Sequence, residues 1–449
     1  MRSTYYLMNK DNKILEFSIT ETPLGESIEQ TKEFSANKPI AFNDIATWID
    51  TRNYAKHKTH FKQWLNEWGI DTAKGFIDIT HCLGINDSLW IKSTDSTLHW
   101  SDINLYHNDF SDVAQKTAFE TGLHGLQISS TDLISPEFTS EGTAPKCWRK
   151  EGDSIYLYKA RLTGASNFGL EANAEYISSN IAQQIVGENS IRYELTMFKD
   201  NLCSKCELFT TEDEGYVPFY KFVDPNKHYT LNDVLNICKE MGYENECRQM
   251  ILVDSIIFNQ DRHLGNFGFI VDNDTYKIKG FAPLFDYNSS MLCNAMSKDI
   301  DSIKSFCQYE NTFQLGHKLG GKFSEVGKAI LTPELKNLIP TNITFPQNDR
   351  YNMEDDRVKN IIKVMENNLA LITDKIYYTV NYENIDINRD DHPVIVHQGS
   401  AISVETATEM KERVESIKQD VADTIQNHKR SIDQSIEAQK QTMSPKMSI

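Results

Sequence analysis

Apolar side chains recur at three- and four-residue spacing in five parts of the chain, which is the pattern of one face of an amphipathic helix. The predicted helices are 54–68, 169–186, 229–241, 246–258 and 353–376. Gly69 and Gly187 mark the ends of the first two, because glycine readily adopts the backbone conformation that terminates a helix. A thinner apolar stripe over 403–441 predicts a long polar helix, either solvated or acting as a coiled-coil oligomerisation arm.

Elsewhere apolar residues alternate with polar ones or form short runs, which predicts β-strands. Three such strands make up the expected antiparallel sheet, namely 155–160, 191–198 and 216–223. Residues 270–278 predict a strand–turn–strand hairpin. Residues 82–92 predict a turn followed by a strand, with Asp87 as a turn carboxylate. Residues 100–106 predict a short extended segment.

The order of these elements predicts an α+β protein, with an antiparallel-sheet lobe followed by a mainly helical lobe. We expect an N-terminal α+β extension, the sheet lobe, the helical lobe, a linker and a helical tail at 1–125, 126–224, 225–380, 381–402 and 403–449. The linker is predicted from the polar composition of its segment and from the Asp-Asp-His-Pro run at 390–393.

Composition and charge narrow the class of partner. The chain has 449 residues and a formal net charge of −18, which argues against a broad nucleic-acid or anionic membrane surface. Its apolar runs are too short for a signal peptide or a membrane span, so we expect a cytoplasmic protein. The eight cysteines are scattered, as expected of reduced thiols, and Cys203-Ser204-Lys205-Cys206 is interpreted as a hairpin turn rather than a metal site.

The candidate chemistry centres on residues 258–268, Phe-Asn-Gln-Asp-Arg-His-Leu-Gly-Asn-Phe-Gly. Asp261 and Asn266 have the D-x-x-x-x-N spacing of a kinase catalytic loop, in which the Asp orients the attacking hydroxyl and the Asn holds magnesium. Asp286 follows a hairpin that returns the chain toward this loop, and it is the second predicted metal ligand. We expect His263 to support the loop through hydrogen bonds rather than to act as a base.

A second group of residues suits the phosphates of a nucleotide. A loop of small residues at 135–149 precedes the strand that carries Lys159, and its predicted nucleotide-binding residues are Ser140, Gly142 and Thr143. Backbone N–H groups of such a loop can approach phosphate oxygens, and Lys159 can neutralise their charge. Glu171 and Glu175 lie one helical turn apart, and we favour Glu175 as the partner of Lys159 because it borders the apolar stripe. Taken alone, the loop is a weak signal, and an ordinary hairpin explains it better.

The runs Asn-Gln-Asp-Arg-His-Leu-Gly-Asn at 259–266 and Ala-Pro-Leu-Phe-Asp at 282–286 resemble the HipA-like serine/threonine kinases of bacterial toxin–antitoxin systems. The resemblance covers about 130–375 and implies a bilobal protein kinase-like fold that uses ATP and Mg²⁺ to phosphorylate a Ser or Thr of a protein. It implies that Lys159 contacts ATP, that Asp261 is catalytic and that Asn266 and Asp286 bind the metal. It also implies autophosphorylation in the phosphate loop, where Ser140 lies.

Two other functions stay open on the sequence. Phosphoinositide-type lipid kinases also use an Asp-Arg-His-x-x-Asn loop, although the acidic composition argues against a membrane substrate. A catalytically silent pseudokinase, binding an antitoxin or regulatory protein, is the alternative from a non-enzymatic class. The protein substrate is not readable from the sequence, because surface loops determine recognition.

Overall fold

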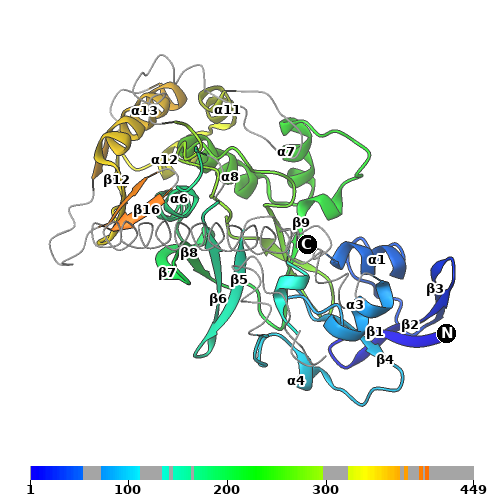
Figure 1. Cartoon of the computed structure of the whole chain (residues 1–449). Coiled ribbons are helices and arrows are strands. Elements are labelled where there is room, and N and C mark those ends of the chain that lie inside the picture. The colour runs from blue at the N-terminus through cyan, green and yellow to red at the C-terminus, as the bar shows by residue number, and fades with distance from the viewer. Residues whose placement is uncertain are drawn as a thin grey trace, which may run out of the picture.

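The computed structural model describes residues 2–53, 72–111, 134–140, 145–162, 166–296, 322–374, 379–382, 394–397 and 400–403. The predicted helix at 54–68, the predicted tail helix at 403–441, and Gly142 and Thr143 lie outside this part of the chain, apart from Ser403. The described part is a mixed α/β structure in which most strand pairs are antiparallel, as predicted (Figure 1).

An antiparallel sheet of order β3-β2-β1-β4 forms the N-terminal unit. Its strands are β1 (Arg2–Asn9), β2 (Asn12–Thr22), β3 (Gly25–Glu33) and β4 (Leu89–Ser93), and the helices α1 (Ile45–Arg52) and α3 (Ala73–Thr80) lie between β3 and β4 in the chain. The core of the unit contains Leu7, Phe17 and Phe76, all fully buried. The extended segment predicted at 100–106 is wrong, because Trp100–Ile103 is a short helix, α4, with a capping box between His99 and Asp102.

A second antiparallel sheet has the order β5-β6-β8-β7. Its strands are β5 (Lys146–Glu151), β6 (Ser154–Ala160), β7 (Glu194–Phe198) and β8 (Asn201–Glu207). The predicted strand that carries Lys159 is therefore confirmed. The hairpin turn predicted at Cys203 and Cys206 is wrong, because both thiols lie within β8 and are buried.

The strand predicted at 216–223 does not belong to this sheet. It is β9 (Glu214–Pro218), followed by the short helix η5 (Phe219–Phe222), and it pairs with β10 (Gly268–Asp272). β10 in turn pairs with β11 (Ile278–Phe281), so the predicted hairpin is confirmed. Gly268 permits this pairing, because a Cβ there would lie 2.2 Å from the Val217 carbonyl oxygen. The strand assignment failed because alternation predicts a strand but not its partner.

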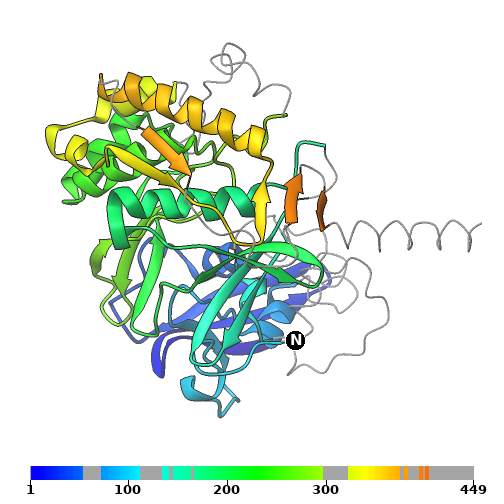
Figure 2. The ribbon, with the colours of Figure 1, turned by 90° about the vertical axis from the view of Figure 1, so that its left-hand side faces the viewer.

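The helix α6 (Glu171–Val186) lies between β6 and β7 in the chain, and it ends at Gly187, as predicted. In Figure 2 it crosses the molecule between the sheets below and the helices above. The helical region contains α7 (Leu231–Glu240), α8 (Glu244–Ile257), α11 (Phe323–Ile330), α12 (Pro333–Leu338) and α13 (Asp355–Thr373). Among the described residues, no helix is long and apolar enough to cross a membrane.

Short strands complete the fold, and they correct the linker predicted at 381–402. β12 (Asn342–Phe345) pairs in parallel with β14 (Thr379–Tyr382). β13 (Tyr351–Met353) pairs in parallel with β15 (Val394–His397), which forms a hairpin with β16 (Ser400–Ser403). The sequence 394–396 is Val-Ile-Val, a β-branched run whose strand tendency was outweighed in the prediction by the polar residues before it.

The N-terminal unit packs against the strand β9 and the β10–β11 turn. The Tyr216 backbone N–H donates to the Asn86 carbonyl oxygen at 2.8 Å, and the Asn9 side-chain amide donates to the Asn273 carbonyl oxygen at 2.7 Å. Gly215 permits this approach, since a Cβ there would lie 2.5 Å from the Asn86 carbonyl oxygen. Hydrogen bonds to the backbone carbonyl groups of Asn86 and Asn273 therefore fix the position of the unit.

Candidate active site

Lys159 is held on β6 by two carboxylates from distant parts of the chain. Its ammonium group donates to Glu175 Oε1 on α6 at 2.6 Å and to Asp286 Oδ1 after β11 at 2.5 Å. The Lys159 side chain is 9% exposed and the Glu175 side chain 1% exposed. The structure thus brings three of the predicted site residues into direct contact.

Burial and the charge of the contacting side chain shift the pKa values of Lys159, Asp286 and Glu175 in opposite directions. Burial alone lowers the pKa of Lys159, but the carboxylates of Asp286 and Glu175 outweigh burial and raise it. For Asp286, burial raises the pKa, and the Lys159 ammonium reverses this and lowers it. For Glu175, burial dominates and the pKa is raised despite Lys159. The lysine is therefore a permanent cation in the neutral pH range.

Of the two glutamates considered on α6, Glu175 contacts the lysine. Its second oxygen, Oε2, accepts a hydrogen bond from Ser204 Oγ on β8 at 2.5 Å, which orients the carboxylate. Glu171 instead accepts from the backbone N–H of Gly169 at 2.9 Å and of Leu162 at 3.2 Å. Glu171 therefore holds the chain that enters α6, one turn before Glu175.

A buried ion pair supports the loop that carries Asp261 and Asn266. Arg262 donates to both carboxylate oxygens of Asp254 on α8, with Nε–Oδ2 and Nη2–Oδ1 distances of 2.8 and 3.0 Å. Both side chains are 0% exposed. Arg262 Nη1 also donates to the carbonyl oxygens of Asn266 and Phe285, at 2.5 and 2.6 Å. One guanidinium thus fixes the loop and the residue preceding Asp286 relative to each other.

Hydrogen bonds within the loop hold Asp261 and Asn266 in place. The Asp261 backbone N–H donates to Asn259 Oδ1 at 3.2 Å. The Asn266 side-chain N–H donates to the Asp261 carbonyl oxygen at 2.9 Å, so the amide nitrogen is engaged. His263 Nδ1 accepts from the Gly265 backbone N–H at 3.0 Å, which agrees with the predicted supporting role of His263.

The backbone before and after the loop adopts unusual conformations. Phe258 ends α8 with a φ of 58° and Asp286 has a φ of 60°, a region that side chains with a Cβ rarely occupy. The Asn259 side-chain N–H donates to Asp254 Oδ1 at 2.9 Å and lies 3.5 Å from the Asp286 carbonyl oxygen. Such strain is stored where surrounding contacts enforce it, and it is common at functional sites.

Asp261 lies in an environment that favours its protonated form more than water does. Burial raises the pKa of Asp261, the nearby His263 lowers it, and the negative charge of Asp286 raises it again, with a net increase. A carboxylate with a raised pKa accepts a proton more readily, which suits a group that orients a hydroxyl.

The predicted phosphate loop is described in part. Ser140 Oγ donates to the Pro136 carbonyl oxygen at 2.7 Å and accepts from the Trp148 indole N–H at 3.0 Å. Its hydroxyl is thus held against the short helix η3 (Pro136–Phe138) and β5. The roles predicted for Gly142 and Thr143 lie outside the described residues.

Four supporting residues were not predicted from the sequence: Asp254, Asn259, Arg262 and Ser204. Asp254 interrupts an apolar helix face and Arg262 follows Asp261, so a buried pair of opposite charge was a readable signal. Ser204 gave no signal, because its contact depends on the sheet order. Within the described residues, no group of three or more His, Cys, Asp or Glu side chains could hold a metal ion.

No protein-family model and no curated protein sequence matches the chain. Its structural neighbours include a proinflammatory kinase, CtkA, of Helicobacter pylori, with 18% identity, a TM-score of 0.40, and 53% of this chain and 91% of that chain covered. They also include the Shewanella oneidensis MR-1 toxin–antitoxin protein HipA in complex with HipB and operator DNA. That match has 12% identity and a TM-score of 0.42, and it covers 83% of this chain and 99% of the other.

A HipA protein, a member of the family that the sequence motifs resemble, is therefore among the structural neighbours. The expectation of no direct nucleic-acid contact gains no support from the neighbours, since the Shewanella complex contains DNA.

Proposed function

We propose that the chain is a HipA-like kinase with a bilobal kinase-like fold, which transfers the γ-phosphoryl group of ATP to a Ser or Thr hydroxyl of a protein. One observation carries the proposal. The buried Lys159 ammonium contacts Glu175 and Asp286, while Arg262 joins the Asp286 segment to the loop of Asp261 and Asn266. A strand lysine paired with a helix glutamate beside a metal-binding aspartate is the arrangement that kinases require.

Each residue has one task in this reaction. Lys159 holds the α- and β-phosphate oxygens, and Glu175 orients its ammonium group from α6. Asp261 accepts a hydrogen bond from the incoming hydroxyl and receives its proton as the new phosphate ester forms. Arg262 is a positioning residue, because it acts through the carbonyl groups of Asn266 and Phe285.

The residues present fit Mg²⁺. Asn266 Oδ1 and the Asp286 carboxylate are hard oxygen ligands, and Mg²⁺ at phosphoryl-transfer sites is typically held by one or two protein oxygens, substrate phosphates and water. When bound, Mg²⁺ neutralises charge on the phosphate oxygens. The Lys159 ammonium, which now contacts Asp286 Oδ1, is close enough to bind phosphate oxygens beside that carboxylate.

The test is phosphate transfer from labelled ATP and Mg²⁺, with dephosphorylated casein as a general Ser/Thr acceptor and phosphatidylinositol vesicles as the lipid acceptor. We expect labelled protein with the wild type, and at least about 100-fold less with Asp261→Asn. Asp356→Asn removes a carboxylate whose side chain is 92% exposed, and it should label like the wild type. Equal labelling by Asp261→Asn contradicts the role of Asp261, and label only in lipid contradicts the protein substrate.

We further propose that Ser140 is autophosphorylated. Its hydroxyl lies against Pro136 and Trp148, so the loop must rearrange before this hydroxyl meets Asp261. Intact-mass measurement after incubation with ATP and Mg²⁺ tests this directly. We expect Ser140→Ala to lose one phosphate relative to the wild type, and an unchanged phosphorylation pattern would remove the proposal.

The division into an N-terminal extension, two kinase lobes and a C-terminal tail is likewise a proposal. So is an antitoxin or regulatory protein as a partner, by analogy with the described complex of the Shewanella protein. We place the kinase in the cytoplasm, where ATP is available and thiols stay reduced. The seven cysteines among the described residues are free, as this location requires.

A further inference from the structure

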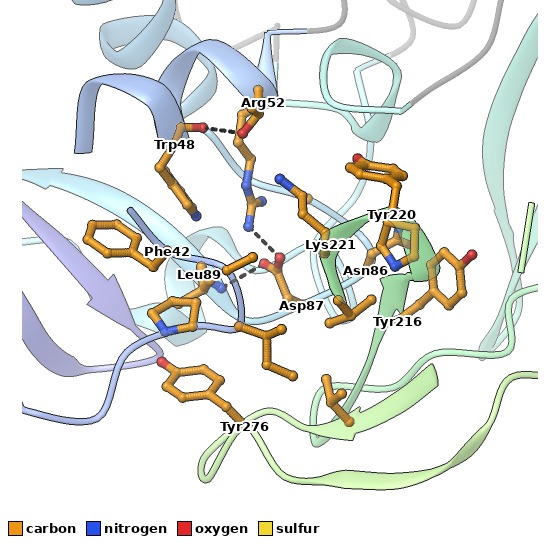
Figure 3. A pocket seen from close by; sticks show the side chains of 18 of the residues that line it. Phe42, Trp48, Arg52, Asn86, Asp87, Leu89, Tyr216, Tyr220, Lys221 and Tyr276 are labelled. Carbon is orange, nitrogen blue, oxygen red and sulfur yellow. Dashed lines mark hydrogen bonds and ion pairs between the residues drawn. The ribbon is translucent and has the colours of Figure 1, made fainter. Parts of the chain in front are cut away.

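A cavity of about 420 Å³ lies between the N-terminal unit and the strands β9 and β10 (Figure 3). One wall comes from α1 and the chain before it, the second from the turn at 84–89, and the third from 216–225 and the β10–β11 turn. None of Lys159, Asp261, Asn266 and Asp286 lines it. Thr139 and Ser140 do line it, so the cavity adjoins the predicted phosphate loop but not the cluster of Lys159, Glu175 and Asp286. Its volume is in the range of small-molecule sites, roughly 300–1,000 Å³.

Aromatic side chains from distant parts of the sequence surround this cavity. Figure 3 labels five of them, which are Phe42, Trp48, Tyr216, Tyr220 and Tyr276. Rings that converge from separate elements offer large, rigid contact surfaces at a low cost in conformational entropy. A flat ring system is the shape that such walls accommodate.

Two cationic side chains and one carboxylate line the cavity, namely Arg52, Lys221 and Asp87. Arg52 forms an ion pair with Asp87, and its guanidinium lies 4.4 Å from the centre of the Trp48 ring. The Asp87 carboxylate also accepts from the Leu89 backbone N–H, which confirms its predicted turn role.

We propose that this cavity binds a small aromatic molecule that carries one negative charge. Its rings pack against the aromatic walls, and its anionic group lies toward Arg52 and Lys221. Such a ligand touches Tyr216, whose hydroxyl donates to the Gly265 carbonyl oxygen in the loop of Asp261 and Asn266 at 2.9 Å. The binding inference goes beyond the proposed kinase activity and does not depend on it.

The probe is anilinonaphthalene sulfonate, an aromatic monoanion that fluoresces in apolar sites, and its uncharged analogue N-phenylnaphthylamine is the matched control. We expect the wild type to bind one molecule of the anion per chain. Lys221→Gln should weaken binding of the anion about three- to tenfold, as loss of one screened charge contact predicts. The same variant should leave binding of the neutral analogue unchanged.

Three further variants make the test specific. Thr51→Trp places a large ring at an exposed cavity position of α1 and should abolish binding of both probes. Lys221→Arg keeps the charge and should bind the anion like the wild type. Lys359→Gln removes a lysine of α13 that does not line the cavity, and it should change neither affinity. Near-UV circular dichroism confirms that each variant is folded, because molten states also bind the anionic probe.

The inference is overturned if saturable binding is absent, or if Thr51→Trp still binds the anion like the wild type. The charge assignment is overturned if Lys221→Gln and Lys359→Gln weaken binding of the anion equally. It is also overturned if the neutral analogue binds as tightly as the anion and Lys221→Gln affects neither probe. These outcomes do not involve phosphate transfer, so they are distinguishable from a failure of the proposed kinase activity.

Discussion

The ion pair between Asp254 and Arg262 yields the sharpest prediction about stability. Asp254→Asn keeps the size of the side chain, so no cavity forms, but it removes the only carboxylate that contacts Arg262 among the described residues. The Arg262 guanidinium is still 0% exposed. The carbonyl oxygens of Asn266 and Phe285, which carry no formal charge, continue to accept its hydrogen bonds. Removing one partner of a buried ion pair typically costs about 3–5 kcal/mol, because the other charge stays buried and unpaired.

We therefore expect Asp254→Asn to lower the free energy of unfolding by about 3–5 kcal/mol. The measurement is equilibrium urea unfolding followed by far-UV circular dichroism. Asp374→Asn is the matched control, since Asp374 pairs with Lys328 at 2.7 Å but its side chain is 70% exposed. Exposed pairs contribute at most about 1 kcal/mol, and Asn tolerates the left-handed backbone of Asp374, whose φ is 54°. A loss below about 1 kcal/mol for Asp254→Asn would refute the reasoning.

Three other predictions concern pH, thiols and the N-terminal unit. Burial raises the pKa of Asp261, and a protonated Asp261 cannot accept the hydroxyl proton. The acidic limb of the pH profile of kcat/KM should therefore lie above the ordinary Asp pKa of about 3.9. A limb at or below that value would contradict the effect of burial. Burial raises the pKa of Cys203 and Cys206 to about 12, and all seven described cysteines are buried. We therefore expect no more than one of the eight thiols to react rapidly with Ellman's reagent until guanidinium is added. Asn9→Ala removes the buried hydrogen-bond partner of Ser88 and of the Asn273 carbonyl oxygen. It should lower the stability by about 1–3 kcal/mol in thermal unfolding. The control Asn37→Ala, which removes an exposed contact, should leave the stability nearly unchanged.

Periodicity determined the elements that pack through a regular apolar face. The helices α6, α7, α8 and α13 and the β10–β11 hairpin were predicted because their buried residues repeat at helical or strand spacing. Trp100–Ile103 was missed because a single turn of helix is shorter than any detectable period. The strands at 394–397 and 400–403 were missed because polar residues surround them and because 394–397 is anchored by the distant strand β13.

The spacing of Asp261 and Asn266 and the position of Asp286 after a hairpin were visible in the sequence by themselves. The apolar stripe also favoured Glu175 over Glu171 as the partner of Lys159, and the packing of α6 across β6 and β8 brings Glu175 into that contact. Only the tertiary structure decided that Ser204 orients the Glu175 carboxylate. Arg262 likewise acquired its role from folding, since its charge is neutralised by a residue of α8 and its hydrogen bonds join two loops. Local spacing specifies which groups are present, whereas contacts between distant segments determine their burial and their charge partners.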